Sequence, residues 1–139
     1  MSEIKLLFLF GMIFCHIVDD YYLQGWLASA KQKDWWKQNA PYQLYKYDYV
    51  MALFMHSFSW SFMIMTIPTY YALNSQYTEN NIDIVSIQIL VTFVLNLIVH
   101  MITDNAKANR KTINLIQDQI IHMTQIIVTW LYLVVVVIR

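Results

Sequence analysis

The sequence predicts an all-α integral membrane protein: a bundle of about four transmembrane helices with a short interfacial segment between the first two. Two features of the composition support this prediction. Of the 139 residues, 58% are hydrophobic and only 13% are charged, whereas a soluble domain carries roughly 25% charged residues. In addition, the apolar residues gather in four long stretches. The length fits a single domain, residues 1–139.

The four apolar stretches differ in length, and a spanning helix needs ~20 mostly apolar residues. They cover residues 4–18, 49–73, 82–102 and 120–138. The last two meet the requirement directly. The second is long and carries Pro68 near its far end, where a proline can kink the helix. The first spans a membrane only if its helix continues through Asp19 and Asp20 to about Gln24.

A cleaved signal peptide is the alternative for the first stretch. Lys5 precedes the apolar core, and Ala28, Ser29 and Ala30 have the small-x-small form of a cleavage site. However, two aspartates and residues 21–26 separate the apolar core from that site. We therefore expect the first stretch to be retained as a span.

The segment between the first two stretches, residues 25–46, combines aromatic residues with lysines. Its members are Trp26, Lys31, Lys33, Trp35, Trp36, Lys37, Tyr42, Tyr45 and Lys46. Such a composition suits the headgroup region of a bilayer. It predicts a short helix lying on the membrane surface, followed by a turn at Pro41. An ordinary connecting loop is the alternative.

The distribution of basic residues predicts the orientation. Residues 25–46 contain four lysines, and the connection after the third stretch contains Lys107, Arg110 and Lys111. The connection at residues 74–81 has no lysine or arginine and contains Glu79. The positive-inside rule places the first and third connections in the cytoplasm and both termini outside. The protein is thus expected to be a multi-pass protein of the cell membrane.

The four histidines fall in four different predicted spans, and three of them have an aspartate four residues away on the same helical face. These residues are His16 with Asp20, His56, His100 with Asp104, and His122 with Asp118. Three amides accompany the same faces: Gln24, Asn96 and Gln119.

In the predicted orientation, these polar residues all lie toward the cytoplasmic side, in a layer ~10–15 Å thick at the helical rise of ~1.5 Å per residue. A polar group in hydrocarbon costs roughly 2.5–3.5 kcal/mol. We therefore expect the polar side chains to face one another inside the bundle. Asp19 is expected to be exposed at the interface, although it is close enough to Asp20 for either to belong to the site.

Imidazoles and carboxylates together are ligands for zinc, manganese or iron. The predicted metal ligands are His16, Asp20, His56, His100, Asp104, Asp118 and His122, supported by Gln24, Asn96 and Gln119. Carboxylates in such sites either bind the metal or orient the imidazoles. The alternative is a metal-free, hydrogen-bonded or proton-relay cluster.

Other residues receive structural interpretations: Trp60 and Trp130 face lipid or pack, and Thr112 can begin the fourth helix as its N-cap.

The leading functional hypothesis is a membrane-embedded metal-dependent hydrolase, with Asp20, Asp104 and Asp118 as the candidate catalytic carboxylates. A site in the cytoplasmic leaflet suits a lipid headgroup, a lipid-linked phosphate or a peptide. The second hypothesis is transport of a metal ion or a proton, in a homo-oligomer. The third is a small accessory protein in which the cluster only fixes the bundle. The formal net charge of zero argues against a nucleic-acid partner.

The short motifs, taken in order, resemble a known family. The run HIVDDYYLQGW, a histidine in the second span, HMITD and then DQIIH resemble the domain of unknown function 3307, a family of small bacterial and phage membrane proteins. The resemblance maps onto His16, Asp20, Gln24, His56, His100, Asp104, Asp118, Gln119 and His122. It implies an integral membrane protein and supplies no activity.

Overall fold

The structure is a computed structural model that describes residues 3–74 and 76–137, and these residues contain helices and no strands. The elements are α1 (Glu3–Ile17), the π-helical turn η1 (Val18–Leu23), α2 (Leu27–Ala30), α3 (Lys33–Asn39), the 3₁₀ turn η2 (Gln43–Tyr45), α4 (Asp48–Leu73), α5 (Gln76–Asn105), the π-helical turn η3 (Ala106–Arg110), α6 (Leu115–Trp130) and the π-helical turn η4 (Leu131–Val137). The prediction of an all-α chain is thus confirmed for the described residues.

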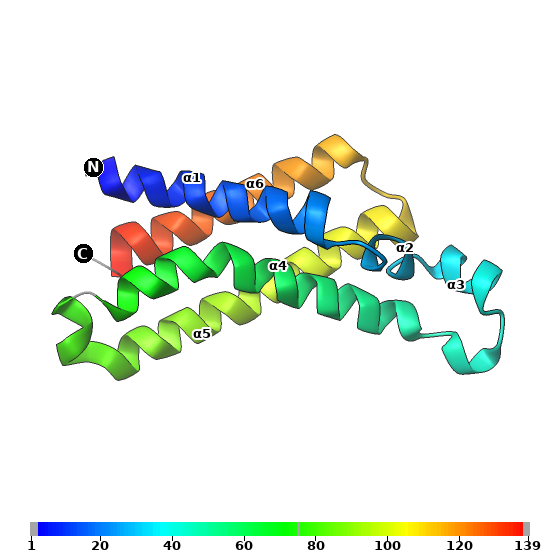
Figure 1. Cartoon of the computed structure of the whole chain (residues 1–139), viewed down its shortest axis with the longest axis horizontal. Coiled ribbons are helices and arrows are strands. Elements are labelled where there is room, and N and C mark those ends of the chain that lie inside the picture. The colour runs from blue at the N-terminus through cyan, green and yellow to red at the C-terminus, as the bar shows by residue number, and fades with distance from the viewer. Residues whose placement is uncertain (1–2, 75, 138–139) are drawn as a thin grey trace.

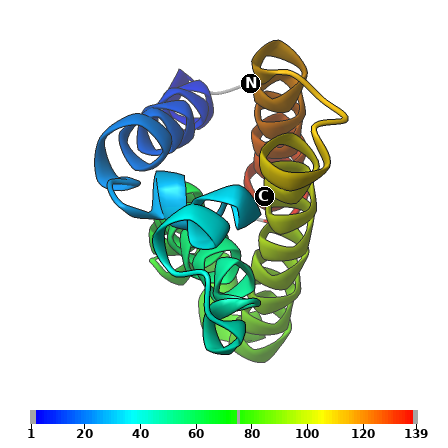
Figure 2. The ribbon, with the colours of Figure 1, turned by 90° about the vertical axis from the view of Figure 1, so that its right-hand side faces the viewer.

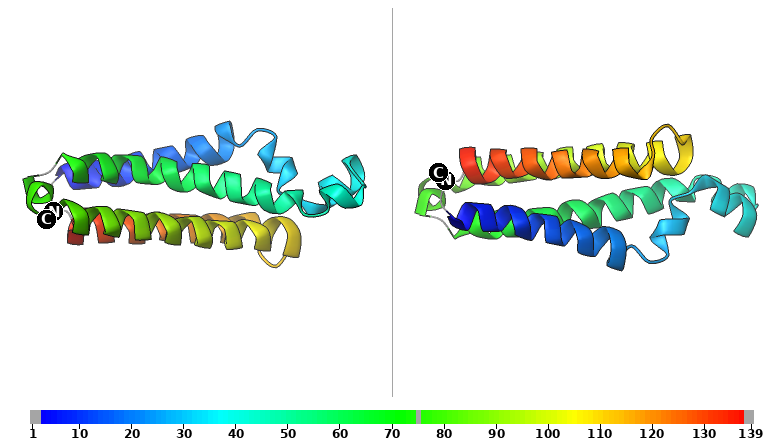
Figure 3. Two further views of the ribbon diagram at one scale, coloured as in Figure 1. Left: turned by 90° about the horizontal axis from the view of Figure 1, so that it is seen from below. Right: turned by 90° about the horizontal axis from the view of Figure 1, so that it is seen from above.

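The four long helices form a bundle in which α1 and α4 make one layer and α5 and α6 the other (Figures 1 and 3). Each long helix contacts its neighbours in the order α1, α4, α5, α6 and back to α1, as the end-on view in Figure 2 shows. The start of α1 lies at one end of the bundle with the end of α4. The short helices α2 and α3 and the turn η3 lie at the other end.

Within the described residues, three helical segments are long and apolar enough to cross a membrane: Glu3–Leu23, Gln43–Leu73 and Asn81–Arg110. The first confirms that the helix continues past Asp19 and Asp20, because η1 extends α1 without a break. The fourth predicted span begins within α6 and reaches residue 138, which lies outside the described residues. The outer faces of the helices carry many exposed leucine, isoleucine and phenylalanine side chains, which suits an apolar surrounding.

The interior of the bundle is divided along its length. Apolar side chains fill the part toward the start of α1, where Met12, Ile64, Val85 and Leu133 belong to one fully buried cluster. The buried histidines and aspartates lie toward α2, α3 and η3, beyond that cluster. The bundle therefore combines an apolar half that packs the helices with a polar half that requires internal partners.

Helix α4 continues through Pro68, and a residue with non-helical backbone angles, Asn81, lies in α5. Two local features differ from the sequence-based expectations. The connection at residues 25–46 contains two short helices, α2 and α3, in place of one. The N-cap of α6 is Asn114, and the expectation of Thr112 was wrong. Asn114 forms a reciprocal capping box with Gln117, which satisfies two backbone donors at the helix start.

We expect Asn114→Ala to lower the free energy of unfolding by about 1 kcal/mol, because the amide of Gln117 loses its acceptor. Thr112→Ala is the matched control and should have a smaller effect, since its hydroxyl makes only a 3.4 Å contact with the carbonyl of Ala106. Thermal unfolding in detergent measures both variants. An equal loss in the two would contradict the assignment of the cap.

Candidate metal centre

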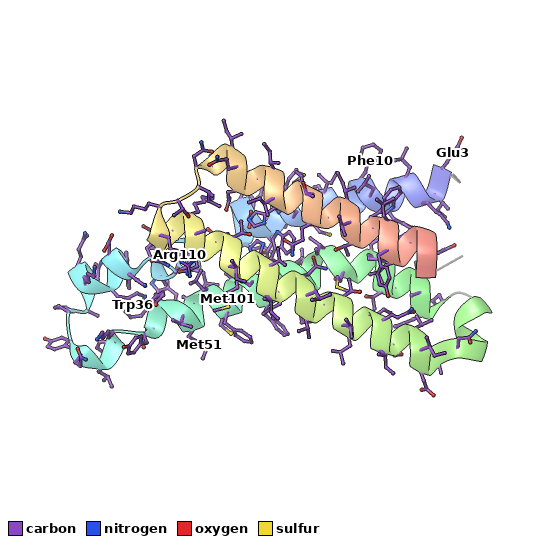
Figure 4. All side chains as sticks on the ribbon, turned by 180° about the vertical axis from the view of Figure 1, so that it is seen from behind. Glu3, Phe10, Trp36, Met51, Met101 and Arg110 are labelled. Carbon is purple, nitrogen blue, oxygen red and sulfur yellow. The ribbon has the colours of Figure 1, made fainter. Side chains whose placement is uncertain are left out.

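The four histidines converge from the four long helices, and each side chain is fully buried or nearly so: His16 from α1, His56 from α4, His100 from α5 and His122 from α6. The rings of His100 and His122 stack with their centroids 4.2 Å apart. In Figure 4, the labelled Met101, next to His100 in the chain, lies in the half of the bundle that also holds Arg110 and Trp36, away from Glu3 and Phe10. The sequence-based expectation of a shared polar layer agrees with this arrangement.

Two overlapping groups of side chains have the spacing of metal ligands. In the first, the Nε2 atom of His56 lies 3.2 Å from the Nε2 atom of His100 and 3.3 Å from the Oδ1 atom of Asp20. Ligand atoms around a tetrahedral ion lie about 3.3 Å apart when each is ~2.0–2.1 Å from the metal. These three side chains could therefore hold an ion with little movement.

The second group consists of His100, Asp104 and His122, all buried. The Nε2 atom of His122 lies 3.4 Å from the Oδ1 atom of Asp104 and 3.5 Å from the Oδ1 atom of Asp118. The Nε2 atom of His100 is 3.8 Å from the same oxygen of Asp104. Because His100 has one lone pair on Nε2 and belongs to both groups, the two groups cannot both use it at once.

Three carboxylates have one oxygen held by a donor. The Oδ2 atom of Asp104 accepts from the ammonium of Lys31 at 2.5 Å, and the Oδ2 atom of Asp118 accepts from the ammonium of Lys107 at 2.6 Å. The Oδ2 atom of Asp20 lies 3.4 Å from the amide nitrogen of Gln119. The Oδ1 atoms of all three lie near imidazole nitrogens, and the Oδ2 atom of Asp104 also lies 3.3 Å from the Nε2 atom of His56.

Several of these central atoms make no hydrogen bond with the described protein atoms. They include the Oδ1 atoms of Asp20 and Asp118 and the Nε2 atom of His122. An unsatisfied polar atom in a buried site costs about 1–3 kcal/mol, more for a charged group. A cation between His122 and Asp118 would satisfy two of these atoms together, which makes the donor set a good fit for a divalent metal ion.

His16 differs from the other histidines because both ring nitrogens already have partners. The indole N–H of Trp60, which can only donate, points at Nδ1 at 2.7 Å. The proton of a neutral His16 ring must then be on Nε2, where it donates to the Oε1 atom of Gln119 at 3.1 Å. The amide nitrogen of Gln119 faces Asp20 and Asp118 at 3.4 and 3.1 Å. The predicted role of His16 as a ligand stays a prediction, and its contacts instead connect Trp60 to two carboxylates.

Asp19 is buried and not exposed, so the expectation for this residue was wrong. Its side chain accepts from the hydroxyl of Ser59 at 2.5 Å and lies 3.7 Å from the Nδ1 atom of His56. The physical reason is the π-helical turn η1, whose wider turn departs from the α-helical spacing used for the prediction. Both Asp19 and Asp20 therefore belong to the polar cluster.

The three supporting amides have different surroundings. The amide nitrogen of Gln24 lies 2.9 Å from the Nε2 atom of His56, so Gln24 contacts the cluster. Gln119 contacts the cluster through His16, Asp20 and Asp118. Asn96 instead exchanges hydrogen bonds with Thr129 and Gln125 of α6. This network joins α5 to α6 beside the cluster, and within the described residues none of its hydrogen bonds reaches a histidine or an aspartate.

Sequence reasoning missed Lys31, Lys107, Trp60 and Ser59 as parts of this centre. The two lysines lie in connecting segments, where helical periodicity does not predict which side chains face the bundle. From the sequence, these lysines predict only the orientation and the membrane-surface segment. The indole of Trp60, besides its bond to His16, stacks on the ring of His100 with centroids 4.2 Å apart. Its position four residues after His56 was the one signal that could have found it.

The segment that supplies Lys31 is fastened to η3. The side chain of Asn109 donates to the carbonyl of Lys31 at 3.0 Å and accepts from the amide of Lys33 at 2.7 Å. Asp34 on α3 pairs with Lys37 and Lys111, and these ammonium groups lower the pKa of its carboxyl. The two connections thus hold each other over the polar end of the bundle.

The net charge of the buried cluster depends on the protonation of its imidazoles. Four carboxylates and two ammonium groups leave two uncompensated negative charges if the imidazoles are neutral: Asp19, Asp20, Asp104 and Asp118 against Lys31 and Lys107. Such an imbalance is costly inside an apolar bundle. One divalent cation neutralises it.

Comparisons with known proteins yield no relative. No family model matches the chain, and no curated protein or solved structure shows significant similarity to it. The resemblance to the domain of unknown function 3307 therefore stays a prediction from its short motifs.

We expect Lys31→Met to lower the free energy of unfolding of chelator-treated protein by about 3 kcal/mol, because the buried carboxylate of Asp104 loses its cation. The double variant Lys31→Met/Asp104→Leu should recover most of this loss. Lys37→Met, in an exposed pair with Asp34, is the control and should change stability by less than about 1 kcal/mol. Denaturant titration in detergent gives all three values, and additive losses in the double variant would contradict a direct pair.

Proposed function

We propose that the chain is a membrane-embedded metal-dependent hydrolase with one divalent ion near the cytoplasmic end of a four-span bundle. The observation that carries this proposal is the set of buried imidazole nitrogens and carboxylate oxygens at ligand spacing. Zinc, manganese and iron all accept such nitrogen and oxygen donors. With neutral imidazoles and ionised carboxylates, one divalent ion would make the buried cluster neutral.

His100, His122, Asp104 and Asp118 are the proposed ligands. The Oδ1 atoms of Asp104 and Asp118 lie 3.4 and 3.5 Å from the Nε2 atom of His122. Among the described residues, the Oδ1 atom of Asp118 and the Nε2 atom of His122 have no hydrogen-bond partner. Lys31 and Lys107 hold the far oxygens of the two aspartates, which fixes the near oxygens for the ion.

With an ion held by these residues, a bound water would have its pKa lowered toward ~7 and would be available as a nucleophile at neutral pH. Asp20 and His56, with their side chains 3.3 Å apart, are the proposed acceptors of the proton from that water. Gln24 holds the ring of His56, and His16 holds Gln119 against Asp20. In this assignment His16 positions Asp20 and does not bind the ion.

The positive charges favour an anionic or strongly polar substrate. The ammonium groups of Lys31 and Lys107 lie within 2.6 Å of the carboxylates that would bind the ion, so they are close to any group that reaches it. With both connections in the cytoplasm, as the positive-inside rule predicts, the substrate would be a lipid headgroup, a lipid-linked phosphate or a peptide in the inner leaflet.

Metal content tests the first part of the proposal. Wild-type protein purified without a polyhistidine tag should carry about one equivalent of zinc, manganese or iron by elemental analysis. His122→Gln and Asp118→Asn should lose it, because each removes a ligand. Asn96→Ala is the matched control, since it removes a buried polar side chain of the separate α5–α6 network and should keep the metal.

A folded wild-type protein that stays free of metal after incubation with all three ions would end the metal proposal. Equal metal loss in Asn96→Ala would indicate that the variants act through the fold and would equally count against the assigned ligands.

Asp20→Asn tests the hydrolase. The variant should keep its metal and lose at least ~10²-fold in turnover, because a proton acceptor typically contributes 10²- to 10⁴-fold. Turnover is measured in mixed micelles against phosphomonoester, lipid-ester and peptide substrates. Full activity in Asp20→Asn, or loss of its metal, would reject the assigned role.

A proton relay is the second candidate, because the same charge balance can be reached without metal. Protonation of two of the four imidazoles would also neutralise the cluster. His56 has carboxylate oxygens of Asp19 and Asp20 on opposite ring nitrogens, 3.7 and 3.3 Å away, which suits proton transfer across the ring. Metal-free wild type would move the proposal to this candidate.

A further inference from the structure

A pocket lies outside the polar cluster, in the segment that connects the first two long helices. Residues of α3, η2 and the start of α4 line this open pocket, which has a volume of about 350 Å³. Its lining includes Lys33, Lys37 and Lys46. Among the described residues, no aspartate or glutamate lines it. We propose that this pocket binds the phosphate-bearing headgroup of an anionic phospholipid.

The positions of the three ammonium groups favour an anion. The Nζ atom of Lys33 lies 4.7 Å from the centre of the Tyr49 ring, and that of Lys46 lies 5.3 Å from the centre of the Tyr47 ring. Contacts of this kind hold a lysine without cancelling its charge. Among the described residues, Lys37 is the one of these three lysines that pairs with a carboxylate, that of Asp34 at 3.0 Å, and Asp34 also pairs with Lys111. The pocket therefore keeps net positive charge.

The other lining residues provide hydrogen-bond donors and flat apolar surface. Four tyrosines and one tryptophan contribute to the wall: Trp36, Tyr42, Tyr45, Tyr47 and Tyr49. The rings of Trp36 and Tyr45 stack with centroids 6.2 Å apart, which gives the pocket a fixed side. Phenol hydroxyls beside ammonium groups are suitable donors for phosphate oxygens.

The surroundings of the pocket indicate a lipid and not a soluble anion. It lies at the start of the apolar segment Gln43–Leu73, where a crossing helix would leave the hydrocarbon. The neighbouring Leu44 is 79% exposed and Tyr42 is 72% exposed, so apolar side chains border the charged pocket. Basic pockets at the end of membrane-crossing helices bind anionic headgroups, and exposed apolar side chains beside them contact the acyl chains.

Native mass spectrometry in detergent tests the pocket with phosphatidylglycerol and phosphatidylcholine of identical acyl chains. Wild-type protein should retain phosphatidylglycerol about tenfold more than phosphatidylcholine. The variant Lys33→Gln/Lys37→Gln/Lys46→Gln should lose this preference, and Lys46→Gln alone should reduce it. The control Arg110→Gln/Lys111→Gln removes positive charge from the same end of the molecule without changing a lining residue, and should keep it.

Three results would overturn the proposal: no preference in wild type, equal loss in the control, or full displacement of the lipid by millimolar glycerol 3-phosphate, which would indicate a soluble anion. Metal content of the triple variant separates this site from the metal centre. The variant should keep the metal of the wild type while losing the lipid preference, and the lipid result stands whether or not the wild type carries metal.

Discussion

The constraint on which the structure depends is the burial of four carboxylates in a bundle whose outer surface is apolar. Charged groups in such surroundings require partners, and the chain provides them from every long helix. Imidazole nitrogens lie near the carboxylates of Asp20, Asp104 and Asp118, and a lysine or an amide holds one oxygen of each. The apolar half of the bundle packs the helices, but the polar half requires one particular arrangement of them.

Much of the fold and of the centre could be predicted from the sequence because both depend on regular helices. A spacing of four residues places His16 with Asp20, His100 with Asp104, and Asp118 with His122 on common faces, and the structure brings these pairs together. The cost of burying polar groups then predicts that the faces meet. These two arguments require no knowledge of how the helices are connected.

The remaining features could not be predicted because they depend on departures from regular helix or on tertiary contacts. Asp19 reaches the interior through the π-helical turn η1, which the residue types of the segment did not reveal. Lys31 belongs to a connection whose lysines the sequence placed at the membrane surface, and only the docking of that connection on Asn109 brings it to Asp104. The occupied nitrogens of His16 follow from the position of Trp60 in another helix.

The two lysines that pair with carboxylates of the cluster are also among the basic residues that predict its orientation in a membrane. Lys31 and Lys107 come from the two connections that lie at the same end of the bundle (Figure 1). The charges from which the positive-inside rule predicts the orientation are therefore internal counterions in the assembled bundle. A chain with one span inserted in the wrong direction would carry one of these lysines to the opposite face and leave an aspartate unpaired in lipid. Insertion of every span in the predicted direction and complete pairing of the two aspartates would thus be a single requirement.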